Sequence, residues 1–167
     1  MKTTRISLIS SLVCLLMAVP APAEDALIDL KVMTPETALK LAKASMAFCR
    51  KSGYQVAVAV VDRMGIAQVI LRDRYAGAHT PETARRKAWT AVSFREDTLA
   101  LVKLTASGSP QAGVRHVTDA LMVGGGVPIE AAGSIVGGVG ISGAPGGAED
   151  DACARAGIEA VIADLEM

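Results

Sequence analysis

A histidine and several cations lie close together between residues 72 and 87 of the sequence. His79 comes directly before the helix-start signal Thr80-Pro81-Glu82, and Arg85 and Arg86 follow one to two turns into that helix. A neutral imidazole can bind iron, while guanidinium groups hold carboxylates through paired hydrogen bonds. The segment therefore predicts a site for an anionic ligand, with His79 as the metal ligand. The alternative is an exposed loop histidine followed by a solvated helix face.

The second histidine and the remaining motifs point less clearly to chemistry. His116 is the alternative iron ligand, although a structural role competes with that interpretation. The sequence contains neither a G-x-S-x-G nor an H-E-x-x-H motif. Its isolated carboxylates, such as Asp62, Asp73 and Glu96, are expected at turns and helix starts. Nothing in these motifs requires an enzyme.

Residues 138–143 spell G-x-G-x-x-G, the spacing of a dinucleotide-binding loop. Gly138 and Gly140, however, alternate with β-branched residues inside a predicted strand. The helix that follows opens with acids at 149–151, and these would repel a pyrophosphate at its N-terminus. The glycines are therefore interpreted as positions where two elements pack closely.

Caps, apolar periodicity and glycine turns divide the chain into nine elements that must position these residues. In order, they are a helix from Thr34 to Gly53, strands over 56–61 and 66–71 joined by a tight turn, helices from Thr80 and over 96–104, two or three strands within 120–143, and a helix over 148–165. The order α-β-β-α-α-β-β-β-α is rich in hairpins. It predicts an α+β fold, with an antiparallel sheet of about five strands flanked by helices.

The first 23 residues have the composition of a secretory signal peptide. Lys2 and Arg5 precede an apolar run over 6–19, and Ala21-Pro22-Ala23 offers small residues for cleavage before Glu24. An uncleaved membrane anchor is the alternative, although a bilayer span needs about 20 apolar residues. The mature chain is therefore expected to be periplasmic or secreted, without stable membrane insertion.

The mature chain of 167 − 23 = 144 residues has the size of one domain. We expect an N-terminal arm over 24–33 and a single domain over 34–167. Removing Lys2 and Arg5 leaves 15 basic residues against 17 acidic ones, a formal charge of −2. This balance offers no basic surface for nucleic acid.

Cys49 and Cys153 are the two cysteines of the mature chain. An oxidising compartment permits a disulfide between them. Alternatively, each is a small buried side chain on its helix. A bridge requires that the first and last helices lie on the same face of the sheet.

Three stretches are together typical of one protein family. They are RRKAWTAVSF at Arg85–Phe94, GGGVPI at Gly124–Ile129, and VGGVGISGAPGG at Val136–Gly147, the last followed by EDDACARAG at Glu149–Gly157. In order and spacing they resemble the GlcG/HbpS family of heme-binding and heme-degrading-type domains. The resemblance covers residues 33–165. It implies an antiparallel sheet flanked by helices and assembly into a homo-oligomer.

The resemblance and the signal peptide together predict an exported protein that binds heme for scavenging, storage or sensing. The binding is expected to be non-covalent, because the sequence lacks C-x-x-C-H. We expect His79 to bind the iron, with His116 as the alternative, and Arg85 and Arg86 to hold the propionates. These roles follow from residue chemistry, since the family has no single fixed axial ligand.

Two other functions remain open at this point. The chain could be an enzyme or accessory protein for a small hydroxy acid or aldehyde, with the same arginines holding a carboxylate and no heme. It could also be an interaction module whose oligomer surface matters more than any ligand.

Overall fold

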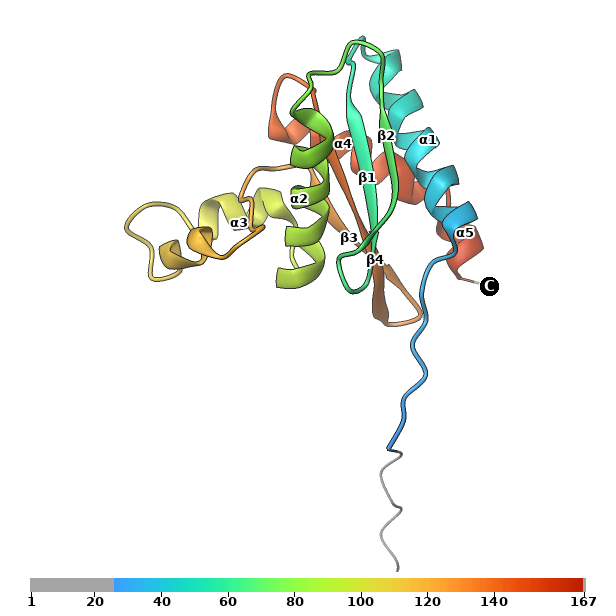
Figure 1. Cartoon of the computed structure of the whole chain (residues 1–167), viewed down its shortest axis with the longest axis horizontal. Helices are drawn as coiled ribbons and strands as arrows, with labels where there is room; N and C mark the ends of the chain where they lie inside the picture. The colour runs from blue at the N-terminus through green and yellow to red at the C-terminus, as the bar shows by residue number, and fades with distance from the viewer. Residues whose placement is uncertain (1–25, 167) are drawn as a thin grey trace, which may run out of the picture. The chain divides into compact units, whose positions relative to one another are not determined.

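Ten elements make up the fold, and a four-stranded sheet lies at its centre (Figure 1). They are α1 (Pro35–Lys51), β1 (Ala57–Asp62), β2 (Ala67–Arg72), α2 (Thr80–Phe94), α3 (Thr98–Leu104), the 3-10 helix η1 (Ala112–His116), β3 (Gly126–Ala131), β4 (Ser134–Ser142), α4 (Gly147–Glu159) and α5 (Ile162–Leu165). The structure, a computed structural model, describes residues 26–166. The chain divides into residues 1–30 and 31–167, and the fold is that of the second unit. The predicted signal peptide lies outside the described residues.

The sheet has the order β2-β1-β4-β3, and every neighbouring pair is antiparallel. The predicted α+β class and the antiparallel sheet between helices are confirmed. None of the helices within residues 26–166 is long and apolar enough to cross a bilayer. In Figure 1, α3 and η1 extend to one side of the sheet.

The predicted count of about five strands is wrong, because residues 120–143 contain only two. The chain before β3 is used for other contacts: Ala120 and Met122 are buried against Leu101 of α3. Gly125 then takes a φ of 107°, which is incompatible with a continuous strand. An apolar composition could not reveal that these side chains pack on a helix.

The predicted closing helix over 148–165 is interrupted. Helix α4 ends at Glu159, and the short α5 begins at Ile162. Between them Val161 leaves the helical conformation, with φ −123° and ψ 0°, and its side chain is buried in the core.

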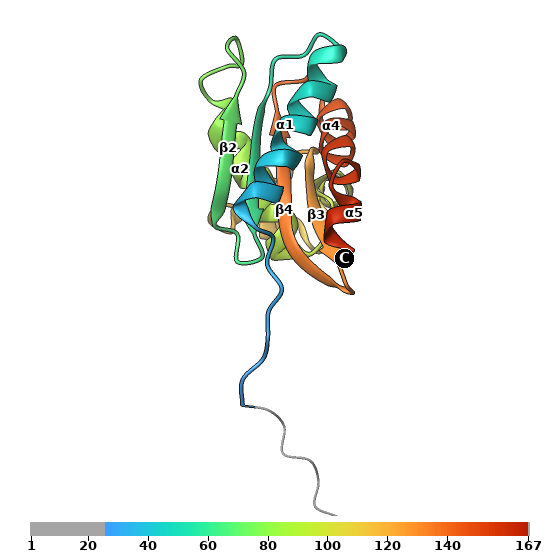
Figure 2. The same ribbon diagram turned by 90° about the vertical axis from the view of Figure 1, so that its right-hand side faces the viewer.

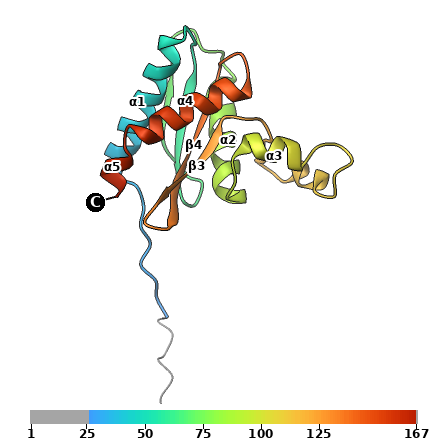
Figure 3. The same ribbon diagram turned by 180° about the vertical axis from the view of Figure 1, so that it is seen from behind.

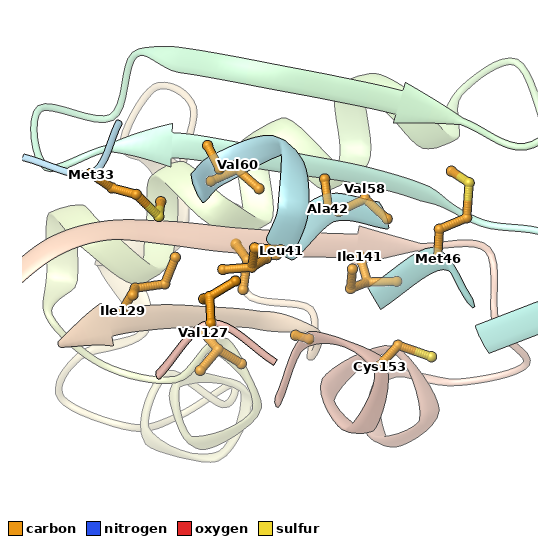
Figure 4. Packing of buried hydrophobic residues seen from close by; sticks show 14 of the residues in the cluster. Met33, Leu41, Ala42, Met46, Val58, Val60, Val127, Ile129, Ile141 and Cys153 are labelled. Atoms are coloured by element: carbon orange, nitrogen blue, oxygen red, sulfur yellow. The ribbon is translucent and has the colours of Figure 1, made fainter. Parts of the chain in front are cut away.

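Helices α1 and α4 cover one face of the sheet, and α2 covers the other (Figure 2). Helix α1 begins where predicted, with the Thr34 hydroxyl accepting a hydrogen bond from the Thr37 amide. Its Leu41 and Ala42 pack on Val58 and Val60 of β1 in the main core (Figure 4).

A disulfide joins Cys49 of α1 to Cys153 of α4, with 5.6 Å between the Cα atoms. The two helices lie side by side on the same face of the sheet (Figure 3). The geometric condition for a bridge is therefore met. Of the two alternatives, the structure shows the disulfide and not two separate thiols.

Helix α2 packs on the other face through glycines of β4. A Cβ atom added at Gly140 would lie 2.0 Å from the Ala84 carbonyl oxygen, and one added at Gly138 would lie 2.5 Å from Val92. Ala84 itself is buried against Ala57 of β1. The interpretation of G-x-G-x-x-G as a close-packing motif is confirmed. Its glycines let the helix backbone lie directly on the sheet.

Replacing Gly140 by alanine is expected to lower the free energy of unfolding by about 3 kcal/mol, because α2 must move away from β4 to admit the new methyl group. Urea unfolding followed by circular dichroism measures the change. The matched control is Gly113→Ala, since a Cβ there meets nothing within 4 Å. It should cost no more than about 0.5 kcal/mol. Equal costs for the two variants would contradict the packing argument.

Reducing the disulfide is expected to lower the free energy of unfolding by about 2–5 kcal/mol, because the bridge restrains residues 104 apart in the unfolded chain. Urea unfolding of the mature protein with and without dithiothreitol tests this. The double variant Cys49→Ala/Cys153→Ala should not respond to the reductant. An unchanged midpoint for the parent protein would rule out a stabilising bridge.

Candidate functional site

A cavity of about 640 Å³ lies at the N-terminal end of α2, and we call it the His79 cavity. Its walls come from five parts of the chain: the segment between α1 and β1, the loop between β2 and α2, the start of α2, the segment before β3, and the stretch from the end of β4 into α4. The side chains that matter for its chemistry are those of Tyr54, Gln55, Tyr75, His79, Thr80, Thr83, Lys87, Ser142 and Asp150.

One stripe of α2 faces this cavity. Thr80, Thr83 and Lys87 follow one another at intervals of three and four residues, so they lie on the same side of the helix. Thr80 is buried, and its hydroxyl donates a hydrogen bond to the Gly77 carbonyl oxygen at 2.7 Å. This bond ties the helix start to the loop that carries His79.

Lys87 is the largest fully buried side chain of the described residues. Its ammonium group donates to an Asp150 carboxylate oxygen at 2.7 Å and to the Ile141 carbonyl oxygen at 2.9 Å. The other Asp150 oxygen accepts from the Ala144 amide at 3.0 Å. A buried ion pair with these additional hydrogen bonds therefore connects α2, β4 and α4 beneath the cavity.

Burial raises the pKa of Asp150 above its ordinary value, because desolvation disfavours the carboxylate. The nearby Lys87 ammonium opposes this effect and lowers the pKa. The Lys87 ammonium therefore favours the charged form of this buried carboxylate.

His79 stands at the edge of the cavity with an exposed side chain. It occupies the N-cap position of α2, yet its imidazole makes no capping hydrogen bond. Tyr54 and Tyr75 line the same cavity, and they are the two tyrosines of the chain. Tyr75 is 80% exposed. The site thus combines an uncommitted imidazole with two phenol groups, and both types of group are known ligands of heme iron.

Arg85 and Arg86 do not line the His79 cavity, because they lie on a neighbouring side of α2. The Arg85 guanidinium contacts Glu82 and Asp119, each at 2.7 Å. These bonds raise the pKa of Arg85 and lower that of Glu82. Arg86 donates to the carbonyl oxygens of Asp119 and Ala120. Both arginines therefore hold the 119–120 segment against α2.

His116 lies on η1, where its side chain is exposed. It does not line the His79 cavity. The structure thus brings His79 together with the tyrosines and the buried ion pair, and it leaves the alternative ligand on a separate element.

Comparison with known proteins identifies the family of the chain. Residues 33–159 match the family model described as haem degrading protein HbpS-like. The chain belongs to the HbpS-like family. A crystal structure of a Streptomyces reticuli HbpS double mutant shares 40% identity over 85% of this chain and 96% of its own, with a TM-score of 0.75. A search of curated protein sequences finds no match.

Two further structures share the fold of this HbpS-like chain. The PduOC heme complex is 28% identical over 77% of this chain and 94% of its own, with a TM-score of 0.73. Klebsiella pneumoniae ORFY is 23% identical over 84% of this chain and 97% of its own, with a TM-score of 0.80. At that identity, ORFY supports the fold alone.

Sequence reasoning grouped Lys87 with the other cations of residues 72–87 and did not predict its burial beside Asp150. A signal was present: Lys87 lies three residues after Ala84 and four before Ala91, on the alanine face of the helix that packs on the sheet. The tyrosines were missed for another reason. They lie 21 residues apart in different loops, and only the antiparallel β1–β2 hairpin brings those loops together.

Replacing Lys87 by methionine is expected to cost about 3–5 kcal/mol, because the variant leaves the Asp150 carboxylate buried without its cation. Chemical unfolding at pH 7 measures the loss. Lys40→Met is the control, since its ion pair with Asp164 is exposed and should contribute about 1 kcal/mol or less.

The pH dependence of the stability of Lys87→Met provides a second test of the ion pair. With its pKa raised further in the folded state, Asp150 binds a proton more tightly when the chain is folded. Its stabilising contribution is therefore fully present below the unfolded pKa of about 3.9 and is lost as the pH rises through the folded pKa. The deficit of the variant relative to the parent should shrink on acidification. A deficit that stays constant with pH would contradict the ion-pair explanation.

Proposed function

We propose that this HbpS-like chain is an exported protein that binds heme non-covalently, for scavenging, storage or sensing. His79 is the proposed iron ligand. The observation that carries the proposal is the position of His79: an exposed imidazole, free of any capping role, at the edge of a 640 Å³ cavity. The PduOC heme complex, which shares this fold and is 28% identical in sequence, supports heme as the ligand.

The residues of the cavity fit the chemical needs of heme. A neutral imidazole supplies a lone pair for the iron, and heme itself would supply the redox-active metal and the porphyrin surface. Tyr54 and Tyr75 offer aromatic area against which a macrocycle can pack.

Arg85 and Arg86 are the proposed partners of the heme propionates. Each would have to exchange a present protein contact for a propionate oxygen. The Arg85–Asp119 pair is open enough for such an exchange, with side chains 24% and 40% exposed. Such a partly buried pair still has access to solvent, so a propionate oxygen could take the place of the Asp119 carboxylate.

The disulfide supports the proposed location outside the cytoplasm. Disulfides form and persist in the periplasm and in secreted proteins, and they are rare in the reducing cytosol. Cys49 and Cys153 are joined in the structure, and the sequence begins with a signal-like segment. A periplasmic or secreted protein is therefore the proposal most consistent with the chain.

Self-association is part of the proposal as well. Ile66 and Ile70 lie on or next to the edge strand β2 and are 65% and 44% exposed. Exposed apolar side chains at a sheet edge favour contact with another molecule. A homo-oligomer covers such residues.

Hemin titration of residues 24–167, followed by absorbance, tests the heme proposal. The parent protein should give a saturable Soret shift, and His79→Ala should lose or displace it, because the iron loses its imidazole ligand. Arg85→Gln should weaken binding without moving the Soret position, since it would remove a propionate contact and leave the iron ligand in place.

His116→Ala is the matched control, because it removes an equally exposed imidazole outside the His79 cavity. Its titration should match the parent. Loss of the Soret shift in His116→Ala alone would move the ligand to His116. The absence of any saturable shift in the parent protein would reject heme binding and favour a small-acid or interaction function.

A further inference from the structure

A second cavity of about 600 Å³ lies at the opposite end of α2 from His79. It lies between two hairpin turns, which line it through residues 63–65 of the β1–β2 turn and Gly133 of the β3–β4 turn. Helix α2 has 15 residues and is therefore about 22 Å long, so this cavity is separate from the His79 cavity. We call it the hairpin cavity.

The apolar wall of the hairpin cavity is built around Trp89, the one tryptophan of the chain. The indole ring packs against the β1–β2 turn: a Cβ atom at Gly65 would lie 2.6 Å from the ring carbon Cδ1. Gly65 also has a φ of 81°, which the turn requires. The turn thus holds the indole in place, and Met64 and Ile135 extend the apolar lining.

Two arginines line the same cavity. Arg63 comes from the β1–β2 turn, and Arg95 comes from the C-terminal end of α2. Neither takes part in any of the ion pairs found among residues 26–166. Arg50, Arg85 and Arg155, by contrast, are each paired with a carboxylate. The Arg63 side chain is partly buried, so its charge lacks both a protein partner and full hydration.

The charge of the cavity is matched to a single negative group. Glu130 is the one carboxylate among the lining residues, and it leaves a net charge of +1 beside the two guanidiniums. A carboxylate would complete this balance, whereas a doubly charged phosphate would leave negative charge close to Glu130. Guanidinium groups bind carboxylates in a planar, two-bond geometry, and an indole favours flat, apolar groups.

We propose that the hairpin cavity binds a small planar organic acid through Arg63, Arg95 and Trp89. The arginines hold the carboxylate, and the flat apolar part of the acid packs on the indole. The volume is that of an ordinary small-molecule site. The proposal does not depend on heme binding at His79, since the two sites share no lining residue.

The indole N–H signal of Trp89 provides a direct test, because a chain with one tryptophan gives one such signal in a ¹H–¹⁵N spectrum. Benzoate is the probe, and benzamide is its uncharged analogue of nearly the same shape. Titrating ¹⁵N-labelled mature protein with benzoate should shift the signal saturably, while benzamide should shift it far less.

The variant Arg63→Gln/Arg95→Gln should bind benzoate at least about tenfold more weakly, because charge-assisted hydrogen bonds to the acid are lost. The control is Arg74→Gln, which removes an exposed arginine outside the hairpin cavity and should leave the affinity unchanged. Arg95 lies at the C-terminal end of α2, where a cation stabilises a helix. The Tm of each variant therefore shows whether it is still folded. The single variant Arg63→Gln, which keeps Arg95, tests the loss of binding without a change at the helix end.

Three results would overturn the proposal. The first is a Trp89 signal that benzoate does not move. The second is an equal response to benzamide, which would show that charge is not recognised. The third is unchanged benzoate affinity in folded Arg63→Gln/Arg95→Gln protein.

Discussion

The close contact between α2 and β4 is the constraint on which the rest of the structure depends. A helix usually stands off from a sheet by the thickness of its side chains, but here glycines at 138 and 140 remove those side chains from the strand. The Ala84 backbone comes so near that any Cβ at Gly140 would overlap it. Dispersion contacts between the two backbones replace those that larger side chains would have made.

This contact determines where both cavities lie. Because α2 is held at a fixed depth and rotation, its N-terminal end places His79 and Thr80 beside the loop that follows β4. Its C-terminal end places Trp89 and Arg95 beside the two hairpin turns. The two cavities thus occur where a short helix ends and the loops of a small sheet extend past it. Such positions suit binding, since loops on a rigid support can change without disturbing the core.

The opposite face of the sheet has a different role. There α1 and α4 bury the larger Val, Leu and Ile side chains, and the disulfide connects the two helices to each other. The buried Lys87–Asp150 pair then links α4 with α2 from the other face, through the end of β4. A charged pair in this position gives less stability than a well-packed apolar contact would, but separating its partners would leave an uncompensated buried charge.

Much of this protein could be predicted from the sequence alone, because the relevant physics is local. Thr34 and Pro35 cap α1, Gly65 makes the β1–β2 turn, and β-branched runs form β1 and β2, each within one residue of the expected bounds. The family followed from glycine-rich stretches whose spacing is itself a packing requirement. His79 was also predicted to lie at a helix start, as it does.

Only the tertiary structure decided the rest, because it depends on contacts between residues far apart in the chain. Residues 120–125 have an apolar composition suited to a strand, yet Ala120 and Met122 pack against Leu101 of α3 instead. Arg85 and Lys87 are cations two positions apart on one helix, but rotation by 200° sends one to the 119–120 segment and buries the other beside Asp150. Sequence patterns within one helix do not show how closely that helix packs on the sheet or which of its cations the packing buries. For that reason the sequence alone determined the elements and the family, while packing determined which side chains share a cavity.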